Sequence, residues 1–325
     1  MKKIQIGILV LFITIIFILF FITFSSPLKE DTLINIEKNS SGRIVARILY
    51  ENNVISSERV FLVYLKLSGK SNDIIPGEFL IPKGKNFLGV ANFITNPKNI
   101  YYHKITLVEG QTVKQFLKLI ADNPNLTGEI ITVKEGTMMP DTYYFTKGST
   151  RASLINRATD SMDKYLNELW RNRNPNLPFK NKHEALTLAA MVEKETGIAS
   201  ERELIAGLFI NRLKMGYKLQ SDPTVAYGLG KESAKGLTKT DLTTVHPYNT
   251  YTMYGLPKGP IANPSRESLR AVFFPDKTPY LYFVADGKGG HVFTTNLIDH
   301  NKEVAKWREI EKNILQKEKA KKSKS

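Results

Sequence analysis

The chain has 325 residues, of which 42% are hydrophobic and 24% charged, a composition that excludes a chain disordered throughout. It contains no cysteine, which excludes a disulfide scaffold and a thiolate zinc site. The formal net charge of +15 favours an anionic partner such as nucleic acid, anionic lipid or an acidic cell-wall polymer, but no nucleic-acid-binding motif is present.

The first element in chain order is an uncharged apolar run, Ile6–Phe24. As a helix its roughly 19 residues would span about 28 Å, close to the thickness of the hydrocarbon core of a bilayer. A cleaved signal peptide is the alternative, although its apolar region is shorter and Ser25–Pro27 is a poor cleavage site. Because Lys2 and Lys3 precede the run, the positive-inside rule places the N-terminus in the cytoplasm. We therefore expect a single-pass anchor in the plasma membrane, with the rest of the chain on the extracytoplasmic face.

The region Thr32–Pro82 is predicted to run strand, helix, helix, strand. Apolar residues repeat with helical spacing in Ile44–Leu49 and in Val60–Leu65, and the pair Pro76-Gly77 introduces the closing strand. No side chain in this pattern is diagnostic. The pattern alone therefore assigns this unit no function.

Two β-rich runs follow, at Ile105–Val108 and Ile131–Val133. Each leads into a Glu-Gly pair, which predicts a strand followed by a turn. The second run precedes Met139–Phe145. Within that segment, Asp141 is either a turn-forming residue or part of a groove.

The C-terminal half is predicted to be helical and to contain one hairpin. Helices are expected at Ser153–Trp170, at Lys182–Thr196, beyond Ser200, and from Leu297 onward. The segment Tyr280–Phe293 predicts two strands joined by a glycine-rich turn. That turn lacks the spacing of a phosphate-binding loop.

The segment Ala189–Gly230 contains three candidate acids, Glu193, Glu195 and Glu203. Glu203 has a structural explanation, because Ser200 precedes it by three residues and the pair predicts a capping box at a helix start. Glu193 and Glu195 would point roughly 200° apart on a helix, so they cannot both face one cleft.

Position along the helix favours Glu195 as the general acid. Gly197 is predicted to cap the helix, which places Glu195 in the last turn, where the helix dipole is unfavourable to a negative charge. Together with partial burial, this would raise its pKa above the free value of about 4.3. Asp222 would be the second carboxylate of a hydrolase, although Ser221–Thr224 is also a turn and helix-start pattern.

Polar and aromatic residues beyond the acid suit a sugar-binding groove. Amides would bind N-acetyl groups and rings would stack on sugar faces, although a tyrosine can equally lie in the core or at a rim. The candidate substrate-binding residues are Gln220, Asp222, Tyr227, Tyr248, Asn249, Tyr251 and Asn263. The five histidines show no metal-ligand spacing, so we expect neither a metal nor another cofactor.

The chain resembles the endolytic murein transglycosylases, the MltG or YceG-like family of bacterial cell-wall lyases. The resemblance is most specific in Met139–Phe145, Ala189–Gly230 and Tyr248–His300. It implies an α+β fold in which a LysM-like βααβ module precedes a helix-rich catalytic domain with a lysozyme-like active site. That module would be either a glycan-binding module or a structural spacer. The expected organisation is a cytoplasmic N-terminus and anchor at 1–26, the module at 27–104, the catalytic domain at 105–315, and a basic tail at 316–325. The tail is either a solvated end or a binding site.

The resemblance also implies the chemistry. Glu195, directly before Thr196, matches the catalytic glutamate of the family, which first protonates the glycosidic oxygen and then accepts the proton of the C6 hydroxyl. The implied reaction is endolytic cleavage of the MurNAc–GlcNAc β-1,4 bond in nascent peptidoglycan strands, leaving 1,6-anhydroMurNAc ends. The enzyme would act as a terminase of glycan polymerisation and associate with murein synthases. Two rival functions remain: a membrane-anchored, non-catalytic glycan-binding scaffold, and a water-using muramidase with Glu195 and Asp222.

Overall fold

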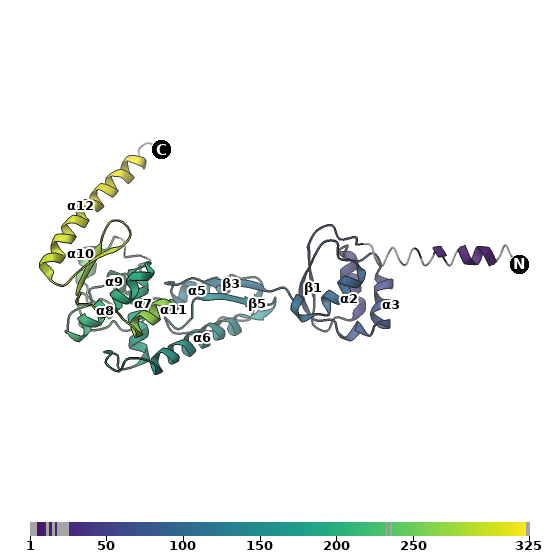
Figure 1. Ribbon diagram of the computed structural model, residues 1–325, viewed down its shortest axis with the longest axis horizontal. Coiled ribbons are helices and arrows are strands. Elements are labelled where there is room, and N and C mark those ends of the chain that lie inside the picture. Colours follow the sequence, from purple (N-terminus) through teal and green to yellow (C-terminus); the bar gives the residue numbers. More distant parts are fainter. Residues whose placement is uncertain are drawn as a thin grey trace. The chain divides into compact units, whose positions relative to one another are not determined.

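The computed structural model describes residues 5–10, 13–14, 17, 26–231, 233–234 and 236–322 (Figure 1). Most of the apolar run Ile6–Phe24, where the sequence predicts an anchor, lies outside the described residues. Within the described part of the chain, no helix combines the length and the apolar character needed to cross a bilayer.

The chain forms two compact units whose segments alternate along the sequence. The first unit contains the described residues up to Lys104, together with Pro124–Thr127 and Tyr144–Ser149. The second unit contains Ile105–Asn123, Gly128–Tyr143 and the described residues from Thr150 onward. The order of elements within Thr32–Pro82 is strand, helix, helix, strand, as the sequence predicts.

The first unit is built around a two-stranded antiparallel sheet in which Ile34 lies opposite Phe79. Its elements are β1 (Thr32–Ile36), α2 (Gly42–Glu51), α3 (Glu58–Leu67), η1 (Lys70–Asn72), β2 (Gly77–Ile81), α4 (Phe87–Ile94) and η2 (Pro97–Asn99). Ser41 and Ser57 cap α2 and α3, because each side chain accepts a hydrogen bond from the backbone N–H three residues ahead. The helices bury their apolar faces against the sheet, and Phe61 is fully enclosed between them.

The rest of the chain is mostly helical, with short two-stranded sheets. Its elements are β3 (His103–Leu107), α5 (Val113–Ala121), β4 (Leu126–Thr127), β5 (Asp141–Phe145), β6 (Ser149–Thr150), α6 (Arg151–Arg171), α7 (Lys182–Glu195), η3 (Ala199–Glu201), α8 (Arg202–Lys214), α9 (Asp222–Gly228), α10 (Lys239–Thr243), α11 (Arg266–Phe273), β7 (Tyr282–Ala285), β8 (His291–Thr294) and α12 (Leu297–Lys322). Strand β3 pairs with β5, and β4 pairs with β6. Helices and sheets together confirm the α+β class.

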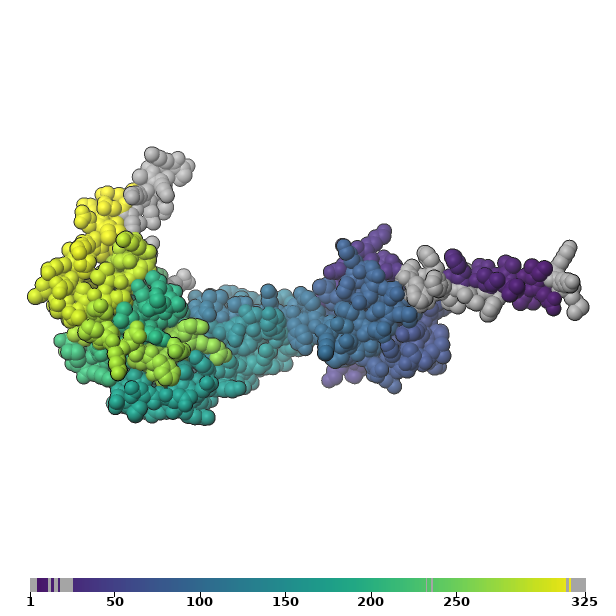
Figure 2. Space-filling view, viewed as in Figure 1, coloured from purple at the N-terminus to yellow at the C-terminus, as the bar shows by residue number. Residues whose placement is uncertain are grey.

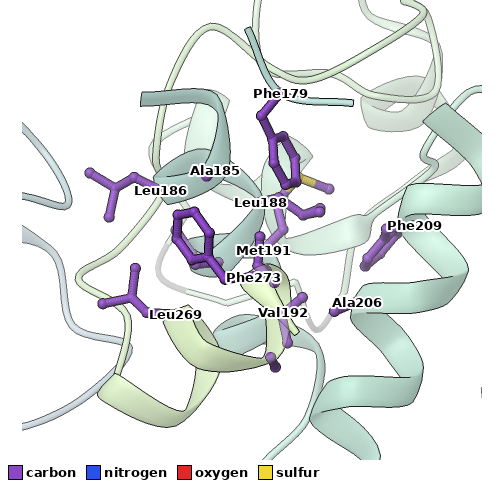
Figure 3. Close-up of a cluster of buried hydrophobic side chains, with 14 of the residues drawn as sticks. Phe179, Ala185, Leu186, Leu188, Met191, Val192, Ala206, Phe209, Leu269 and Phe273 are labelled. Atoms are coloured by element: carbon purple, nitrogen blue, oxygen red, sulfur yellow. The ribbon is translucent and has the colours of Figure 1, made fainter. Parts of the chain in front are cut away.

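Helix α7 is the centre of the second unit. Every residue from Ala185 to Val192 is buried, and a helix that is apolar on all sides needs neighbours all round it. Helices α8 and α11 supply much of that cover through side chains such as Phe209 and Phe273 (Figure 3). Close packing also explains Gly207 in α8, where a Cβ atom would lie 2.4 Å from the carbonyl oxygen of Asp276. The core therefore holds the C-terminal end of α7 in a fixed place.

The predicted C-terminal hairpin is present, with β7 and β8 antiparallel. Its Phe283 ring meets Phe209 of α8 edge-on, with centroids 5.9 Å apart. Helix α12 packs along the hairpin, and the yellow C-terminal residues gather together in the space-filling view (Figure 2). At the turn, Gly287 leaves room for Ile310 of α12, because a Cβ there would come within 2.7 Å of the isoleucine side chain.

One expected strand is not formed. Strand β3 does lead to a turn in which Gly110 has a φ of 72°, as the sequence predicts. Ile131–Val133, however, is irregular. The end of that segment is fixed instead by Glu135, whose carboxylate accepts hydrogen bonds from the N–H groups of Val113 (2.9 Å) and Gly136 (3.1 Å). The hydrogen bonds of the Glu135 side chain, and not pairing with another strand, therefore fix the end of this segment.

Candidate active site

Glu195 is the last residue of α7, as its predicted place in the last turn requires. The predicted cap at Gly197 is wrong, because Thr196 is the C-cap residue and leaves the helix in an extended conformation. The Thr196 N–H still donates to the Val192 carbonyl at 3.3 Å. The buried helix thus ends abruptly and presents Glu195 where the irregular chain begins.

The carboxyl group of Glu195 is crowded by protein, although part of the residue remains accessible. Burial raises its pKa to about 7, and the nearby charge of Asp222 acts in the same direction. The Ser221 hydroxyl, which donates to Oε1 at 2.5 Å, and the charge of Arg212 act in the opposite direction. A carboxyl group with this pKa exists in both protonation states near neutral pH, as a general acid and base requires.

Ser221 is held in place by two threonines. Its N–H donates to the Thr250 hydroxyl at 2.9 Å, and the Thr224 hydroxyl donates to the Ser221 carbonyl at 2.6 Å. The two threonine hydroxyls lie 2.9 Å apart. This arrangement joins the start of α9 to the loop that contains Thr250, and it fixes the hydroxyl that faces Glu195.

Three of the predicted substrate-binding residues lie around this arrangement. Asp222 is exposed and begins α9, as the helix-start pattern predicts, and its Oδ1 accepts a hydrogen bond from the Tyr251 hydroxyl at 2.6 Å. Burial and the Asp222 carboxylate raise the pKa of Tyr251, so its hydroxyl stays a donor. Gln220 is exposed, has a φ of 53°, and donates its N–H to the Thr250 carbonyl at 3.2 Å. The positive φ strains the backbone of Gln220, which lies beside Ser221, and it sets the orientation of the Gln220 side chain.

Two more predicted residues form an aromatic pair. The rings of Tyr227 in α9 and Tyr248 lie 4.9 Å apart at 60°. The Tyr227 hydroxyl donates to Glu135 at 3.3 Å, and burial, with the Glu135 charge, raises the pKa of that tyrosine. Burial also raises the pKa of Glu135. The pair is half-buried, so its rings are partly covered by the core and partly accessible.

The two predicted asparagines are buried instead within loops. The amide nitrogen of Asn249 donates to the carbonyls of Asp241, Leu242 and Thr244, the nearest at 2.7 Å. Asn263 is fully buried; its Oδ1 accepts from Met138 N–H, and its amide nitrogen donates to another backbone carbonyl, each at 3.0 Å. These amides hold loop backbones together, and a substrate contact by either residue stays a prediction.

The other two glutamates of the signature have structural partners. Glu193 accepts from both the N–H (2.9 Å) and the hydroxyl (2.5 Å) of Ser265, the N-cap residue of α11. The predicted capping box at Glu203 is wrong, because η3 precedes α8 and the N-cap is Glu201, without a side-chain bond. Glu203 pairs with Arg270 at 2.5 Å. Glu193 and Glu195 therefore have different partners, as their spacing on the helix predicts.

Sequence reasoning missed a second set of contacts beside the acid. The Thr196 hydroxyl donates to Glu201 at 3.1 Å, and Glu201 also binds the N–H and the ring of His291 in β8. Burial alone would raise the pKa of Glu201, but these hydrogen bonds outweigh it and lower the pKa. The hairpin is thereby tied to the residue that follows Glu195. No local pattern marks this contact, because Glu201 and His291 lie 90 residues apart.

Arg212 was also missed. Its side chain is buried, its Nε donates to the Leu281 carbonyl at 2.6 Å, and its Nη1 donates to the Leu219 carbonyl at 2.8 Å. The signal in the sequence was a permanent charge two residues after the apolar run Leu204–Ile210 in α8, since a buried arginine needs partners. Within the described residues, no group of three His, Asp or Glu side chains is placed to hold a metal ion.

The chain belongs to the YceG-like family, whose model matches residues 34–306. It is similar to the endolytic murein transglycosylase of Bacillus subtilis, with 32% identity over 86% of this chain and 87% of that protein. The endolytic murein transglycosylase of Streptococcus pneumoniae is 36% identical over 53% of this chain and 32% of its own length. Among solved structures, the crystal structure of a yceG-like protein from Listeria monocytogenes matches with a TM-score of 0.51 and 28% identity, over 84% of this chain and 99% of that one. These matches confirm the family resemblance.

Proposed function

We propose that this protein is an endolytic lytic transglycosylase that cleaves the MurNAc–GlcNAc β-1,4 bond of peptidoglycan strands and leaves 1,6-anhydroMurNAc ends. The enzyme class, a peptidoglycan lytic transglycosylase, follows from the family and from the shared name of its curated relatives. The observation that supports Glu195 as the acid is its near-neutral pKa in a buried but partly accessible position at the end of α7.

One carboxyl group is enough for this reaction. Protonated Glu195 donates its proton to the glycosidic oxygen as the C1–O bond breaks, and the GlcNAc leaves with a new hydroxyl. The resulting carboxylate accepts the proton of the C6 hydroxyl of the same muramic acid while that oxygen bonds to C1. The Ser221 hydrogen bond and the Arg212 charge both favour the carboxylate that forms between the two steps. No water enters the product.

The muramidase is the second candidate, because Asp222 lies close enough to Glu195 to affect its pKa. A hydrolase would need Asp222 as its base or nucleophile. The short hydrogen bond from Tyr251 holds that carboxylate and favours a positioning role. A non-catalytic scaffold is disfavoured, because a binding surface has no need of a carboxyl group whose pKa is raised by burial.

Product analysis separates these functions. The purified protein, incubated with uncrosslinked glycan strands, is expected to yield mid-length strands ending in 1,6-anhydroMurNAc, which mass spectrometry identifies by the loss of one water. Asp222→Asn is expected to give the same product. Free reducing ends would favour the muramidase, and release of disaccharides alone would contradict endolytic cleavage.

We propose that the run Ile6–Phe24 anchors the protein in the plasma membrane with the catalytic region on the extracytoplasmic face. Its uncharged sequence and the two preceding lysines support this topology. The enzyme would then act as a terminase on strands newly released by murein synthases, with residues 27–104 as a LysM-like glycan-binding module. A reporter fused after Ser325 is expected to be active only if it works outside the cytoplasm; activity of a cytoplasmic reporter would contradict the topology.

Replacing Ser221 by alanine is expected to move the alkaline limb of the pH–rate profile to higher pH. The Ser221 hydrogen bond lowers the pKa of Glu195, so its removal raises that pKa further above about 7. Cleavage begins with a protonated acid, so activity is lost as pH rises through the pKa. Initial rates across the neutral range measure the limb, and Ser200→Ala, at an exposed site, is the control. An unmoved limb, or one at lower pH, would contradict the assigned contact.

A further inference from the structure

A pocket of about 230 Å³ opens in the second unit beside the acid. Its lining residues are Arg212, Tyr217, Lys218, Gln220, Tyr254 and Tyr282. Two of them connect it to the catalytic centre. Gln220 directly precedes Ser221, the hydrogen-bond partner of Glu195, and Arg212 is close enough to Glu195 to act on it electrostatically. The pocket is therefore a neighbouring subsite and not a remote cavity.

The pocket contains two cations. Arg212 is only 7% exposed, and its Nε and Nη1 are occupied by backbone carbonyls. Within the described residues, its Nη2 donates to no protein atom, and neither Arg212 nor Lys218 forms a salt bridge. The Lys218 ammonium group lies 5.2 Å from the centre of the Tyr254 ring. A nearly buried guanidinium and an ammonium that share one pocket favour an anionic group.

The walls and the volume limit what that group can be. Tyr217 and Tyr254 are 45% and 69% exposed, so their rings form an accessible rim. A pocket of this volume is smaller than the roughly 300–1,000 Å³ typical of sites that enclose a whole ligand. It suits one branch of a larger substrate better than a run of sugars. Tyrosines, an amide and two cations together suit a short peptide with a carboxylate.

We propose that this pocket binds a carboxylate of the stem peptide carried by a muramic acid residue near the bond that is cut. The inference rests on the proposed function. In peptidoglycan the lactyl group of MurNAc is amide-linked to the peptide, so the polysaccharide itself is uncharged and the carboxylates lie on the peptides. A pocket with two cations has no partner on the sugar chain alone.

The test uses the full chain and one preparation of uncrosslinked strands, half of it treated with excess methylamine and a carbodiimide, so that the peptide carboxylates become neutral amides while the peptides stay attached. Lys218→Met is expected to lower kcat/KM on the untreated strands about tenfold, the usual scale of a charge-assisted hydrogen bond, and to leave the rate on the amidated strands unchanged. Lys218→Arg is expected to retain the carboxylate-dependent rate. Lys214→Met, an exposed lysine of α8 outside the pocket, is the matched control.

The outcomes separate this inference from the proposed function. A wild-type protein that cuts both substrates equally well, or a Lys218→Met variant that loses the same factor on both, would overturn the peptide subsite alone. A loss seen only on strands that retain a terminal pyrophosphate would also overturn it, in favour of phosphate binding. If neither substrate yields anhydro ends, the proposed function itself fails.

Discussion

Replacing Glu195 by glutamine is expected to lower the rate of strand cleavage by at least about 10²-fold, the usual scale of general acid catalysis. Glutamine has nearly the same size and can still bind the Ser221 hydroxyl, but it cannot give a proton to a leaving oxygen. The fold is expected to tolerate the change, because with a pKa of about 7 the neutral form of this group is already present at neutral pH in the native state. Initial rates on uncrosslinked glycan and a thermal unfolding curve measure the two effects.

Two matched controls lie in the same segment. Glu203→Gln is expected to keep full activity, because it alters only a partly exposed pair with Arg270. Glu193→Gln changes the acceptor for Ser265 at the start of α11, so it is expected to lower stability more than activity. An active Glu195→Gln variant together with an inactive Glu193→Gln variant would show that the acid lies two residues earlier.

Replacing Asn263 by alanine is expected to lower the free energy of unfolding by about 2–4 kcal/mol. The change leaves the fully buried N–H of Met138 without its acceptor, which costs about 1–3 kcal/mol. The half-buried carbonyl of Gln111 loses the side-chain amide but keeps the Asn263 N–H at 2.9 Å, so that loss adds only about 0.5–1.5 kcal/mol. Chemical denaturation measures the change. At a temperature where the variant is folded, its KM for glycan is expected to stay close to the wild-type value.

Asn176→Ala is the control for that experiment, because Asn176 is exposed in the loop before α7 and its replacement is expected to change stability little. The comparison also decides between two readings of Asn263. The sequence alone predicts a substrate contact, whereas the structure favours a residue that holds loops together. Unchanged stability with a raised KM would restore the substrate contact.

The predictable features are those that arise from local sequence. Helical periodicity and turn residues give α7, the C-terminal hairpin and the helix-start pattern at Asp222, because neighbours in the chain determine these elements. The place of Glu195 at the end of α7 follows in the same way. The sequence predicted that Tyr227, Tyr248, Tyr251 and Asp222 share a groove. It did not predict that Tyr227 pairs with Tyr248 or that Tyr251 binds Asp222.

The features that sequence reasoning missed depend on contacts between distant residues. Ser221 lies 26 residues from Glu195, and Asn263 lies 125 residues from Met138. Nothing near either residue in the chain reveals these partners. The capping box predicted at Glu203 is wrong for the opposite reason, because its local pattern is present but does not determine the structure. A short 3₁₀ turn shifts the start of the helix, and the Glu203 carboxylate forms an ion pair with Arg270. Tertiary contacts override local preference in such cases.

The alternation of the two units along the chain bears on how this protein can be divided for study. Lys104 is the last residue of the first continuous segment of the first unit. Two later segments, Pro124–Thr127 and Tyr144–Ser149, also belong to that unit. A gene fragment that begins at Ile105 would therefore encode two segments whose packing partners have been deleted. A fragment that ends at Lys104 would lack those same segments. Exchanging one unit between homologues would require a junction at each of these boundaries. A chimaera with a single junction would combine segments of one unit from two different proteins, so it is expected to be unfolded.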